Sequence, residues 1–408
     1  MTTSELSEGR FVLVTHEVGT VPVQQVMAVL KPRTKGGLLI HHPLQFRGMA
    51  RSKSSYSRGW GDVRAHDEVW FPRRVTPEVL SYLKDFLLTI FWVIRARCVF
   101  DVMIAAGNLN AFAGLTLRWM GLVRKVVYYA IDFSETRFSN RFLEACYRKI
   151  DEIVLCRVDA TWHLSHAMKG AREHRFPRAF TARGGRHQLV PVGVHASRMR
   201  GVARHCLDAT ERIVFLGNIL ESHGLGVVIE ALSILCREWP RLMLDIYGDG
   251  PDKNLVQAQV HSLALSDRVT FHGYIEADEV LEVELGRGGI AVAMYAPHLS
   301  TFSRFADPGK IKMYLGAGLP IVMTSIPPIA GDLDGDCAII SLYSSEACAT
   351  AIRALLSNPE RYCQMRSRAF SVASGLEWET ITLVSLAQLS ATSAVVPLGG
   401  VHGDASPS

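Results

Sequence analysis

Lys310 and Lys312 stand close behind an Asp-Pro pair in the segment ADPGKIKMYLGAGLPIV, residues 306–322. Asp307 is a favourable N-cap residue and Pro308 suits the first helical position, so the pattern predicts that a helix begins here. The N-terminus of a helix attracts anions, and lysines in its first turn strengthen that attraction. The segment therefore predicts an anion site of the kind that holds a phosphate. The alternative is an ordinary capped helix of an α/β domain, with Lys312 on a solvated face.

Strand-like apolar runs alternate with helical runs along the whole chain, and this alternation is typical of doubly wound α/β folds. In the first half we expect strands at FVLVTH, GGLLIHHP, FDVMIAAG, KVVYYAID, ATWHLS and HQLVPVGV, and helices over residues 21–31, 77–97, 110–121 and 141–158. In the second half we expect strands at RIVFLGNI, RLMLDIYGDG, RVTFHGYI, GIAVAMYA and LPIVMT, and further helices over residues 225–240, 254–264, 277–285 and 346–356.

A length of 408 residues favours two domains. The predicted fold class is α/β, with two Rossmann-like domains that face a central cleft, and ligands of such sheets bind at the carboxyl ends of the strands. The predicted parts are an N-terminal domain over residues 1–195, a polar linker over 196–210, a C-terminal domain over 211–375, a helix over 376–389 that crosses back to the first domain, and a disordered tail over 390–408.

Cysteine usage and apolar runs exclude several classes of protein. The eight cysteines form no CxxC pair, so neither a zinc site nor a disulfide framework is predicted, and a reducing cytoplasm fits best. The first residues, MTTSELSEGRFVLVTHEVG, lack the long apolar core of a secretory signal. The longest apolar run, FLLTIFWVI, is too short to span a bilayer, which needs about 20 residues. It is either a buried core helix or an interfacial one.

The net charge of +5 hides a strong division between the two halves. Residues 1–200 hold 30 Lys and Arg against 16 Asp and Glu, a net charge of +14, and the remainder holds 14 against 23, a net charge of −9. The basic residues gather in the stretches 47–74 and 172–186, the first of which also contains Trp60 and Trp70. Such a composition suits either a nucleic acid or an anionic membrane surface.

Motifs of other enzyme classes are missing from the sequence. No G-x-G-x-x-G opens a helix after a strand, which argues against a dinucleotide-dependent oxidoreductase. No nucleophile elbow is present either, which argues against a serine hydrolase. Nucleic-acid binding would explain the basic half but not the phosphate-binding pattern of the second half, so we expect no nucleic-acid partner.

The second half resembles the family 4 glycosyltransferases, which are retaining enzymes of GT-B fold. Five motifs in the family's order carry the resemblance: VFLGNILESHGLGVVIEAL, DIYGDGP, RVTFHGYI, GIAVAMYAP and ADPGKIKMYLGAGLPIV. KVVYYAID, RVDATWHLS and LVPVGVH extend it more loosely, so that it covers about residues 99–385. The resemblance implies a hexosyltransferase whose first domain holds the acceptor and whose second domain holds a UDP- or GDP-sugar. No metal and no other cofactor is implied.

The resemblance also implies a set of site residues. Lys310 is expected to contact the donor diphosphate beside the helix N-terminus. The candidate catalytic residues are Asp132, Asp307 and His16, and His41 and His42 stand at another predicted strand end. The expected donor-binding residues are Gly19, Gly217, Asn218, His223, Gly248, Asp249, Tyr274, Gly309, Lys310, Ile311 and Lys312.

Several positions depart from the family pattern. Asn218 and His223 stand where the family commonly has Arg and Lys, and Ile131 stands where a His usually precedes the Asp. Phe305 and Met313 stand where the family usually has two glutamates. The chain therefore resembles a bacterial envelope-polysaccharide subgroup that lacks these glutamates. The second hypothesis is a catalytically silent GT-B protein that acts as a binding or partner subunit.

The leading hypothesis specifies partners and a location. The donor is a nucleotide sugar, and the acceptor is a lipid-linked or cell-envelope glycan. Because the first half is basic and rich in aromatic residues, we also expect it to dock on an anionic membrane surface. The expected location is the cytoplasm, with peripheral binding on the inner face of the cell membrane.

Overall fold

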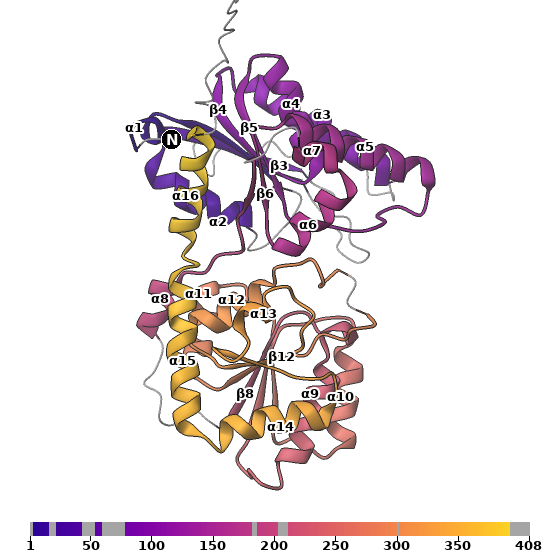
Figure 1. Ribbon diagram of the computed structural model, residues 1–408, viewed down its shortest axis with the longest axis vertical. Coiled ribbons are helices and arrows are strands. Elements are labelled where there is room, and N and C mark those ends of the chain that lie inside the picture. The colour runs from indigo at the N-terminus through magenta and orange to yellow at the C-terminus, as the bar shows by residue number, and fades with distance from the viewer. Residues whose placement is uncertain are drawn as a thin grey trace, which may run out of the picture.

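A computed structural model describes residues 3–15, 22–42, 54–58, 78–181, 186–202, 211–299 and 302–391. Two α/β units lie one above the other in Figure 1, the first in indigo to magenta and the second mainly in pink to orange. Each unit is built on one sheet. The two Rossmann-like units agree with the fold class that the alternation of strands and helices predicts.

The first sheet has seven strands in the order β3-β2-β1-β4-β5-β6-β7. All neighbouring strands are parallel except β2 and β3, which are antiparallel. The central strands β1, β4 and β5 are apolar runs that are largely buried, as strands with helices on both faces must be. The strands are β1 Arg10–Thr15, β2 Gly36–His41, β3 Ser55–Arg58, β4 Phe100–Ala106, β5 Val123–Ala130, β6 Ala160–His163 and β7 His187–Leu189.

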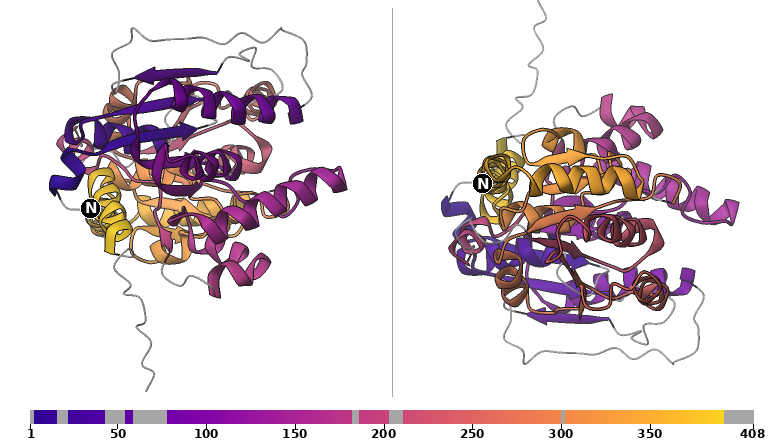
Figure 2. Two further views of the ribbon diagram at one scale, coloured as in Figure 1. Left: turned by 90° about the horizontal axis from the view of Figure 1, so that it is seen from above. Right: turned by 90° about the horizontal axis from the view of Figure 1, so that it is seen from below.

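Helices cover both faces of the first sheet. α2 packs against α16, whereas α3 packs against α4 and α4 against α5 (Figures 1 and 2). The side-chain oxygens of Asn140 and Ser165 accept backbone N–H groups and so cap α5 and α6. The helices of this unit are α1 Thr3–Ser7, α2 Pro22–Leu30, the short 3₁₀ helix Lys31–Arg33, α3 Glu78–Arg95, α4 Asn108–Trp119, α5 Arg141–Arg157, α6 His166–Arg175 and α7 Pro177–Thr181.

The second sheet has six strands, all parallel, in the order β10-β9-β8-β11-β12-β13. Its carboxyl edge gathers the loops that follow β8, β9, β10 and β11. The strands are β8 Arg212–Leu216, β9 Met243–Tyr247, β10 Val269–Gly273, β11 Ile290–Ala293, β12 Ile321–Met323 and β13 Ala338–Ile340. The helices are α8 Ala196–Val202, the 3₁₀ helix Glu221–His223, α9 Leu225–Leu235, α10 Lys253–Ser262, α11 Asp278–Gly286, α12 Gly309–Gly316, α13 Ala330–Leu333, α14 Ser345–Leu356, α15 Pro359–Ser374 and α16 Trp378–Ala391.

Two passages of the chain between the units lie side by side. The first leads from β7 to α8 and the second from α15 to α16. The backbone N–H of Val194 donates to the carbonyl of Leu376 at 2.9 Å, and the N–H of Trp378 donates to the carbonyl of Val194 at 3.3 Å. α16 then packs on α2, and its residues Leu386 and Leu389 belong to the hydrophobic core of the first unit.

Several short or polar elements are absent from the sequence-based assignment. β3 lies within the basic stretch 47–74, and as a four-residue edge strand it is too short for an apolar period to emerge. α8 occupies the first part of the predicted linker, which is therefore not irregular throughout. α15 is mostly polar and buries only one narrow face, including Tyr362, Met365 and Ala369. The rest of the linker and the tail from residue 392 lie outside the described residues.

The helix α3 contains the longest apolar run of the sequence and is half-buried. Trp92 and Val93 lie in the core, whereas Leu83, Leu87 and Phe91 are exposed. The run is thus neither wholly a core helix nor wholly a surface helix. In the part of the chain that the structure covers, no helix combines the length and the apolar character that a membrane crossing requires.

Candidate functional site

The helix α12 begins where the sequence predicts it, but a different residue caps it. Pro308, with extended backbone, occupies the N-cap position, and among the described residues no side chain caps the helix there. At its other end the helix is held to the sheet by Tyr314, whose hydroxyl accepts from the N–H of Leu216 at 2.7 Å and donates to the carbonyl of Val292 at 3.3 Å. These bonds fix the N-terminus of α12 beside the carboxyl ends of β8 and β11.

Asp307 is not the N-cap of this helix, contrary to the expectation from its sequence position. One carboxylate oxygen accepts the backbone N–H of Val192 at 2.7 Å, and the other forms an ion pair with Lys312 at 2.9 Å. Both side chains are buried, so Lys312 does not lie on a solvated face. Burial raises the pKa of Asp307 above its ordinary value, although the Lys312 ammonium acts in the opposite direction. The pair ties the start of α12 to the segment that follows β7.

Lys310 is the residue in this region whose ammonium group would pair with a bound anion. Its Nζ atom is buried and has no hydrogen-bond partner among the described residues. It lies 4.9 Å from the ring centroid of Phe215 and 4.6 Å from that of Tyr295. Burial lowers the pKa of Lys310 to about 7. A buried ammonium without a counterion is unfavourable, and a bound anion would supply that counterion.

The glycine loops at the carboxyl edge of the second sheet stand next to Lys310. Gly217 follows β8 with a φ of +129°, and Gly248 follows β9 with a φ of +141°. A Cβ atom on Gly217 would lie 3.6 Å from the Lys310 Nζ atom, and one on Gly248 would lie 2.0 Å from the Gly217 carbonyl oxygen. The two loops are therefore in direct contact, and only glycine fits at residue 248.

Replacement of Gly248 with alanine is expected to lower the free energy of unfolding by about 3 kcal/mol, because the new methyl group collides with backbone and the φ is unfavourable. Chemical denaturation measures this loss. Gly170 lies inside α6 with open space around it, and Gly170→Ala is the matched control, expected to stabilise the protein by up to about 1 kcal/mol. Equal effects of the two changes would contradict the packing argument.

His223 and Asn218 lie on the same side of the site as Lys310. His223 Nδ1 is 2.7 Å from the Asn218 carbonyl oxygen, and its ring stands edge-on to Tyr295. Burial, followed by the Lys310 charge, lowers the pKa of His223 to about 4. The imidazole is therefore neutral near pH 7, its one proton lies on Nδ1 and is donated to the Asn218 carbonyl, and Nε2 is left as a hydrogen-bond acceptor.

Asp249 and Tyr274 stand further out than these residues. Asp249 accepts the N–H of Gly250 at 2.8 Å and pairs with Lys253 at 3.1 Å, and the first of these bonds is the main reason why its pKa is lowered. Tyr274 follows β10 and its side chain is 68% exposed. Both residues are at the carboxyl edge of the sheet, but neither is enclosed with Lys310.

The first unit presents Asp132 and a loop contact at its own carboxyl edge. Asp132 follows β5 and pairs with Arg137 at 2.5 Å, and Arg172 donates to its carbonyl oxygen at 2.6 Å. Phe305 reaches across from the second unit: its ring packs edge-on against Phe133 at 4.9 Å between centroids, and its carbonyl accepts from the Ser165 hydroxyl at 2.6 Å. Phe305 thus joins the two units, at a position where a glutamate was expected from the resemblance.

The structure does not bring all the expected residues together. His16 and Gly19 lie outside the described residues. His42 is buried, with Nδ1 3.0 Å from the Ser54 hydroxyl and Nε2 2.8 Å from the Thr89 hydroxyl, so it connects β2 and β3 to α3. Met313 packs against the core around β11 and β12.

Two residues of the site were missed by the sequence analysis. Phe215 and Tyr295 enclose the Lys310 side chain, and each belongs to a run that was read only as a strand. The signal was present, because both aromatic residues stand at or beyond the carboxyl ends of neighbouring strands, β8 and β11.

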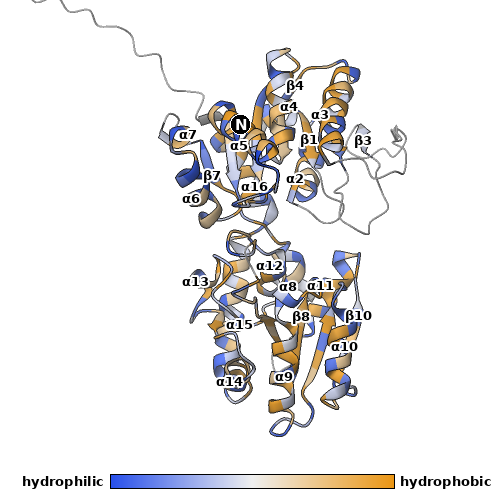
Figure 3. Ribbon diagram, turned by 90° about the vertical axis from the view of Figure 1, so that its right-hand side faces the viewer, coloured by the Kyte–Doolittle hydropathy of each residue, from blue (hydrophilic) through white to orange (hydrophobic). Residues whose placement is uncertain are grey.

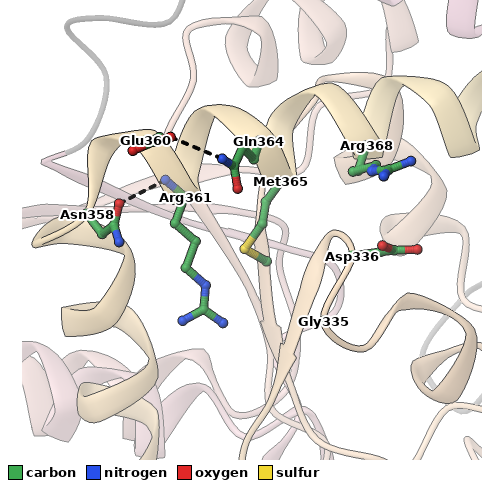
Figure 4. A pocket seen from close by; sticks show the side chains of 8 residues that line it. All are labelled: Gly335, Asp336, Asn358, Glu360, Arg361, Gln364, Met365 and Arg368. Carbon is green, nitrogen blue, oxygen red and sulfur yellow. Dashed lines mark hydrogen bonds between the residues drawn. The ribbon is translucent and has the colours of Figure 1, made fainter.

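A pocket between the loop before β13 and the start of α15 lies away from these residues. It has a volume of about 500 Å³, and Figure 4 shows charged side chains of both signs around it. Two of its polar groups serve the helix itself, since the Asn358 side chain accepts the N–H of Arg361 at 2.9 Å. None of the expected site residues lines this pocket, whose lining is Gly335, Asp336, Asn358, Glu360, Arg361, Gln364, Met365 and Arg368.

Comparisons with known proteins concern the same half of the chain and the same fold. Residues 210–358 match the family model described as glycosyl transferases group 1. No curated protein matches the sequence.

Solved structures of similar fold cover nearly the whole chain. Sucrose-phosphate synthase from Thermosynechococcus elongatus has a TM-score of 0.67 at 15% identity, over 95% of this chain and 99% of its own. The Anabaena protein HepE in complex with UDP has a TM-score of 0.64 at 14% identity, over 94% and 100%. A trehalose-6-phosphate structure from E. coli, bound with UDP-2-fluoro glucose, has a TM-score of 0.66 at 13% identity, over 95% and 100%. The fold is that of the GT-B glycosyltransferases.

Proposed function

We propose that this chain is a glycosyltransferase that moves a hexose from a UDP- or GDP-sugar to a lipid-linked or cell-envelope glycan acceptor. The observation that carries the proposal is the Lys310 Nζ atom, which is buried beside the N-terminus of α12 and the Gly217 loop and has no partner among the residues that the structure describes. The match of residues 210–358 to group 1 glycosyl transferases supports it. The solved structures in complex with UDP or a UDP-sugar share its fold and favour a nucleotide-sugar donor.

In the proposed reaction the bond between the sugar and the nucleotide diphosphate breaks while a bond forms from the acceptor hydroxyl oxygen to the anomeric carbon. Negative charge develops on the departing diphosphate, which takes up the acceptor proton. Lys310 and the free N–H groups at the start of α12 would meet that charge with fixed donors, in surroundings where most water is excluded. The side-chain amide of Asn218 would add a hydrogen bond. Because these protein groups supply the stabilisation, the proposal includes transfer without a metal ion, with retention at the anomeric carbon as the resemblance implies.

The two candidate carboxylates have different surroundings. Asp307 has both oxygens engaged, by Val192 and Lys312, so we assign it the role of positioning α12. Asp132 is partly exposed and pairs with Arg137 at the carboxyl edge of the first sheet. We assign Asp132 the acceptor side of the site, where it would orient a hydroxyl group. The proposed function also includes peripheral binding of the basic first half to an anionic membrane.

A panel of UDP- and GDP-sugars tests the proposal, with donor hydrolysis and transfer measured by nucleotide release. Lys310→Ala is expected to lower kcat at least 100-fold, because about this loss is typical when one hydrogen-bond donor to the transition state is removed. Lys35 is an exposed lysine of the first unit, paired with Glu8, and Lys35→Ala is the matched control with unchanged kcat.

The outcomes separate the leading hypothesis from its alternative. Binding of UDP or GDP without any turnover would favour a catalytically silent binding subunit. Phe305 and Met313 suggest this alternative, because they stand where the family usually has two glutamates. Absence of both binding and turnover would overturn the donor site itself. Sedimentation with anionic liposomes at low salt tests the membrane part separately, because failure there leaves the transferase part intact.

A further inference from the structure

We infer that the apolar cavity between α3, α4 and α5 binds the aliphatic chain of a lipid-linked acceptor. This inference deepens the proposed function and rests on it, because it names the chemical class of the acceptor. The cavity lies in the first unit, on the side of the sheet covered by these three helices.

The cavity is large, and its walls are mainly hydrocarbon. Its volume is about 640 Å³, which is within the range of small-molecule sites. Aromatic side chains form much of the wall, and Phe86 stacks on Phe112 with ring centroids 5.8 Å apart. The apolar lining includes Leu83 and Phe86 of α3, Leu109 and Phe112 of α4, and Leu143 and Ile150 of α5.

Polar groups gather at one end of the cavity. Asn108, at the start of α4, donates from its side chain to the Tyr147 carbonyl at 3.4 Å, and Asp132 and Arg137 form their ion pair there. Since Asn108 follows β4 and Asp132 follows β5, this end lies at the carboxyl edge of the first sheet. Phe302, from the loop of the second unit that leads to α12, also lines the cavity. A ligand is therefore oriented with its polar end toward the donor domain and its apolar end among the helices.

The cavity wall joins a row of exposed apolar side chains along α3, a helix that is drawn partly in orange in Figure 3. Leu83 lines the cavity and is also 51% exposed. The face continues along the helix through exposed side chains at helical spacing, namely Leu80, Leu87, Phe91 and Ile94. On the neighbouring α5, Phe142 is 74% exposed. Water-exposed apolar surface of this extent marks a binding region.

Charge selects a lipid with an anionic headgroup as the source of the chain. Residues 1–200 carry a net charge of +14, against −9 for the remainder. Arg141, exposed at the start of α5, stands two residues before the lining residue Leu143 in the sequence. When the aliphatic chain of the acceptor lies in the cavity, the apolar face of α3 would rest on the adjoining lipids. The phosphate and glycan of the acceptor would extend past Asp132 toward Lys310. This arrangement would present the acceptor hydroxyl to the donor without removing the whole lipid from the membrane.

A chain-length series of alkyl phosphates tests the inference with the intact protein. Butyl, hexyl and octyl phosphate are titrated by calorimetry, below the concentrations at which they form micelles. Each added methylene is expected to strengthen binding about fourfold, the factor that corresponds to full burial of one methylene, so octyl phosphate should bind about 200-fold more tightly than butyl phosphate.

Two cavity-filling variants and one surface variant complete the design. Leu143→Trp and Leu109→Trp fill the cavity from α5 and α4, and each is expected to weaken octyl phosphate binding at least tenfold. Leu87 is exposed on α3 and does not line the cavity, so Leu87→Ser should leave octyl phosphate binding within about twofold of the original value. Circular dichroism and the midpoint of urea denaturation show for every variant that it is folded, independently of UDP or GDP binding.

The results distinguish the inference from the function on which it rests. A flat chain-length series, or equal losses in Leu87→Ser and in both filling variants, would overturn the cavity as the binding site while donor binding and turnover stand. If octyl phosphate binds as expected but no UDP or GDP binds, the transferase proposal fails and the cavity remains an aliphatic site.

Discussion

Replacement of Lys310 with methionine is expected to weaken UDP or GDP binding by about 10- to 150-fold and, in the same variant, to stabilise the free protein. The loss of binding corresponds to one hydrogen bond to a charged group. The gain in stability follows from burial, because the Nζ atom has no partner in the described part of the chain and the pKa of Lys310 falls from 10.5 to about 7. Methionine fills the space between Phe215 and Tyr295 without a charge to desolvate.

The gain in stability has a defined pH dependence. Lys310 has a lower pKa in the folded protein than in the unfolded chain, so the unfolded chain binds more protons between pH 7 and pH 10.5. The lysine is therefore most destabilising below pH 7, and its effect decreases as pH rises. At pH 6 the methionine variant is expected to gain about 3 kcal/mol in the free energy of unfolding, and at pH 10 the gain should be small.

Urea denaturation at the two pH values, combined with UDP and GDP titrations, measures both effects. Lys310→Arg is the control, because arginine keeps the positive charge that methionine removes. This variant should not show the gain in stability at pH 6. If Lys310→Met destabilised the free protein at pH 6, the lysine would have a structural partner and the argument for an anion site would fail.

Asp307→Asn is expected to lower the free energy of unfolding by about 3 to 5 kcal/mol. The asparagine can still accept the Val192 N–H, but Lys312 then remains buried without a counterion. Removal of one member of a buried ion pair is strongly destabilising for this reason, whereas replacement of both members is often tolerated. The double variant Asp307→Asn with Lys312→Met should recover most of the lost stability.

A double-mutant cycle measured by chemical denaturation tests this expectation. The exposed pair Lys149 and Glu152 on α5 is the control, and Glu152→Gln should change stability by less than about 1 kcal/mol. Additive effects of the two changes at residues 307 and 312 would contradict the pair. Donor binding is an independent readout, because a displaced α12 would weaken UDP or GDP binding in Asp307→Asn and the double variant would restore it.

The local patterns of the sequence predicted much of the framework. The central strands β1, β4 and β5 are long apolar runs, and apolar period and length suffice to identify such strands. The Asp-Pro-Gly turn placed the start of α12 within one or two residues. β3 and α15 escaped because an edge strand of four residues and a polar helix with one narrow buried face carry little apolar signal.

The side-chain partners of the site were beyond the reach of local pattern. Asp307 has the spacing of an N-cap, yet its carboxylate bonds to Val192, 115 residues earlier in the chain. Lys312 has the spacing of a solvated lysine, yet the Asp307 carboxylate retains it in the interior. In the sequence, only its position behind the turn distinguishes Lys310 from ordinary surface lysines. Its enclosure by Phe215 and Tyr295 depends on which strands become neighbours, and strand order is a property of the whole fold.

The paired passages at Val194 determine how the two units can move. Because both passages are hydrogen bonded to each other, they act as one pivot, and rotation about it displaces each part of the molecule in proportion to its distance. Val192, which holds Asp307 and so the start of α12, is only two residues from this pivot. The end of α12 that we propose as the phosphate site would therefore travel least if the units turned. Opening and closing would regulate how far an acceptor must reach, while the donor's anchorage stays nearly stationary.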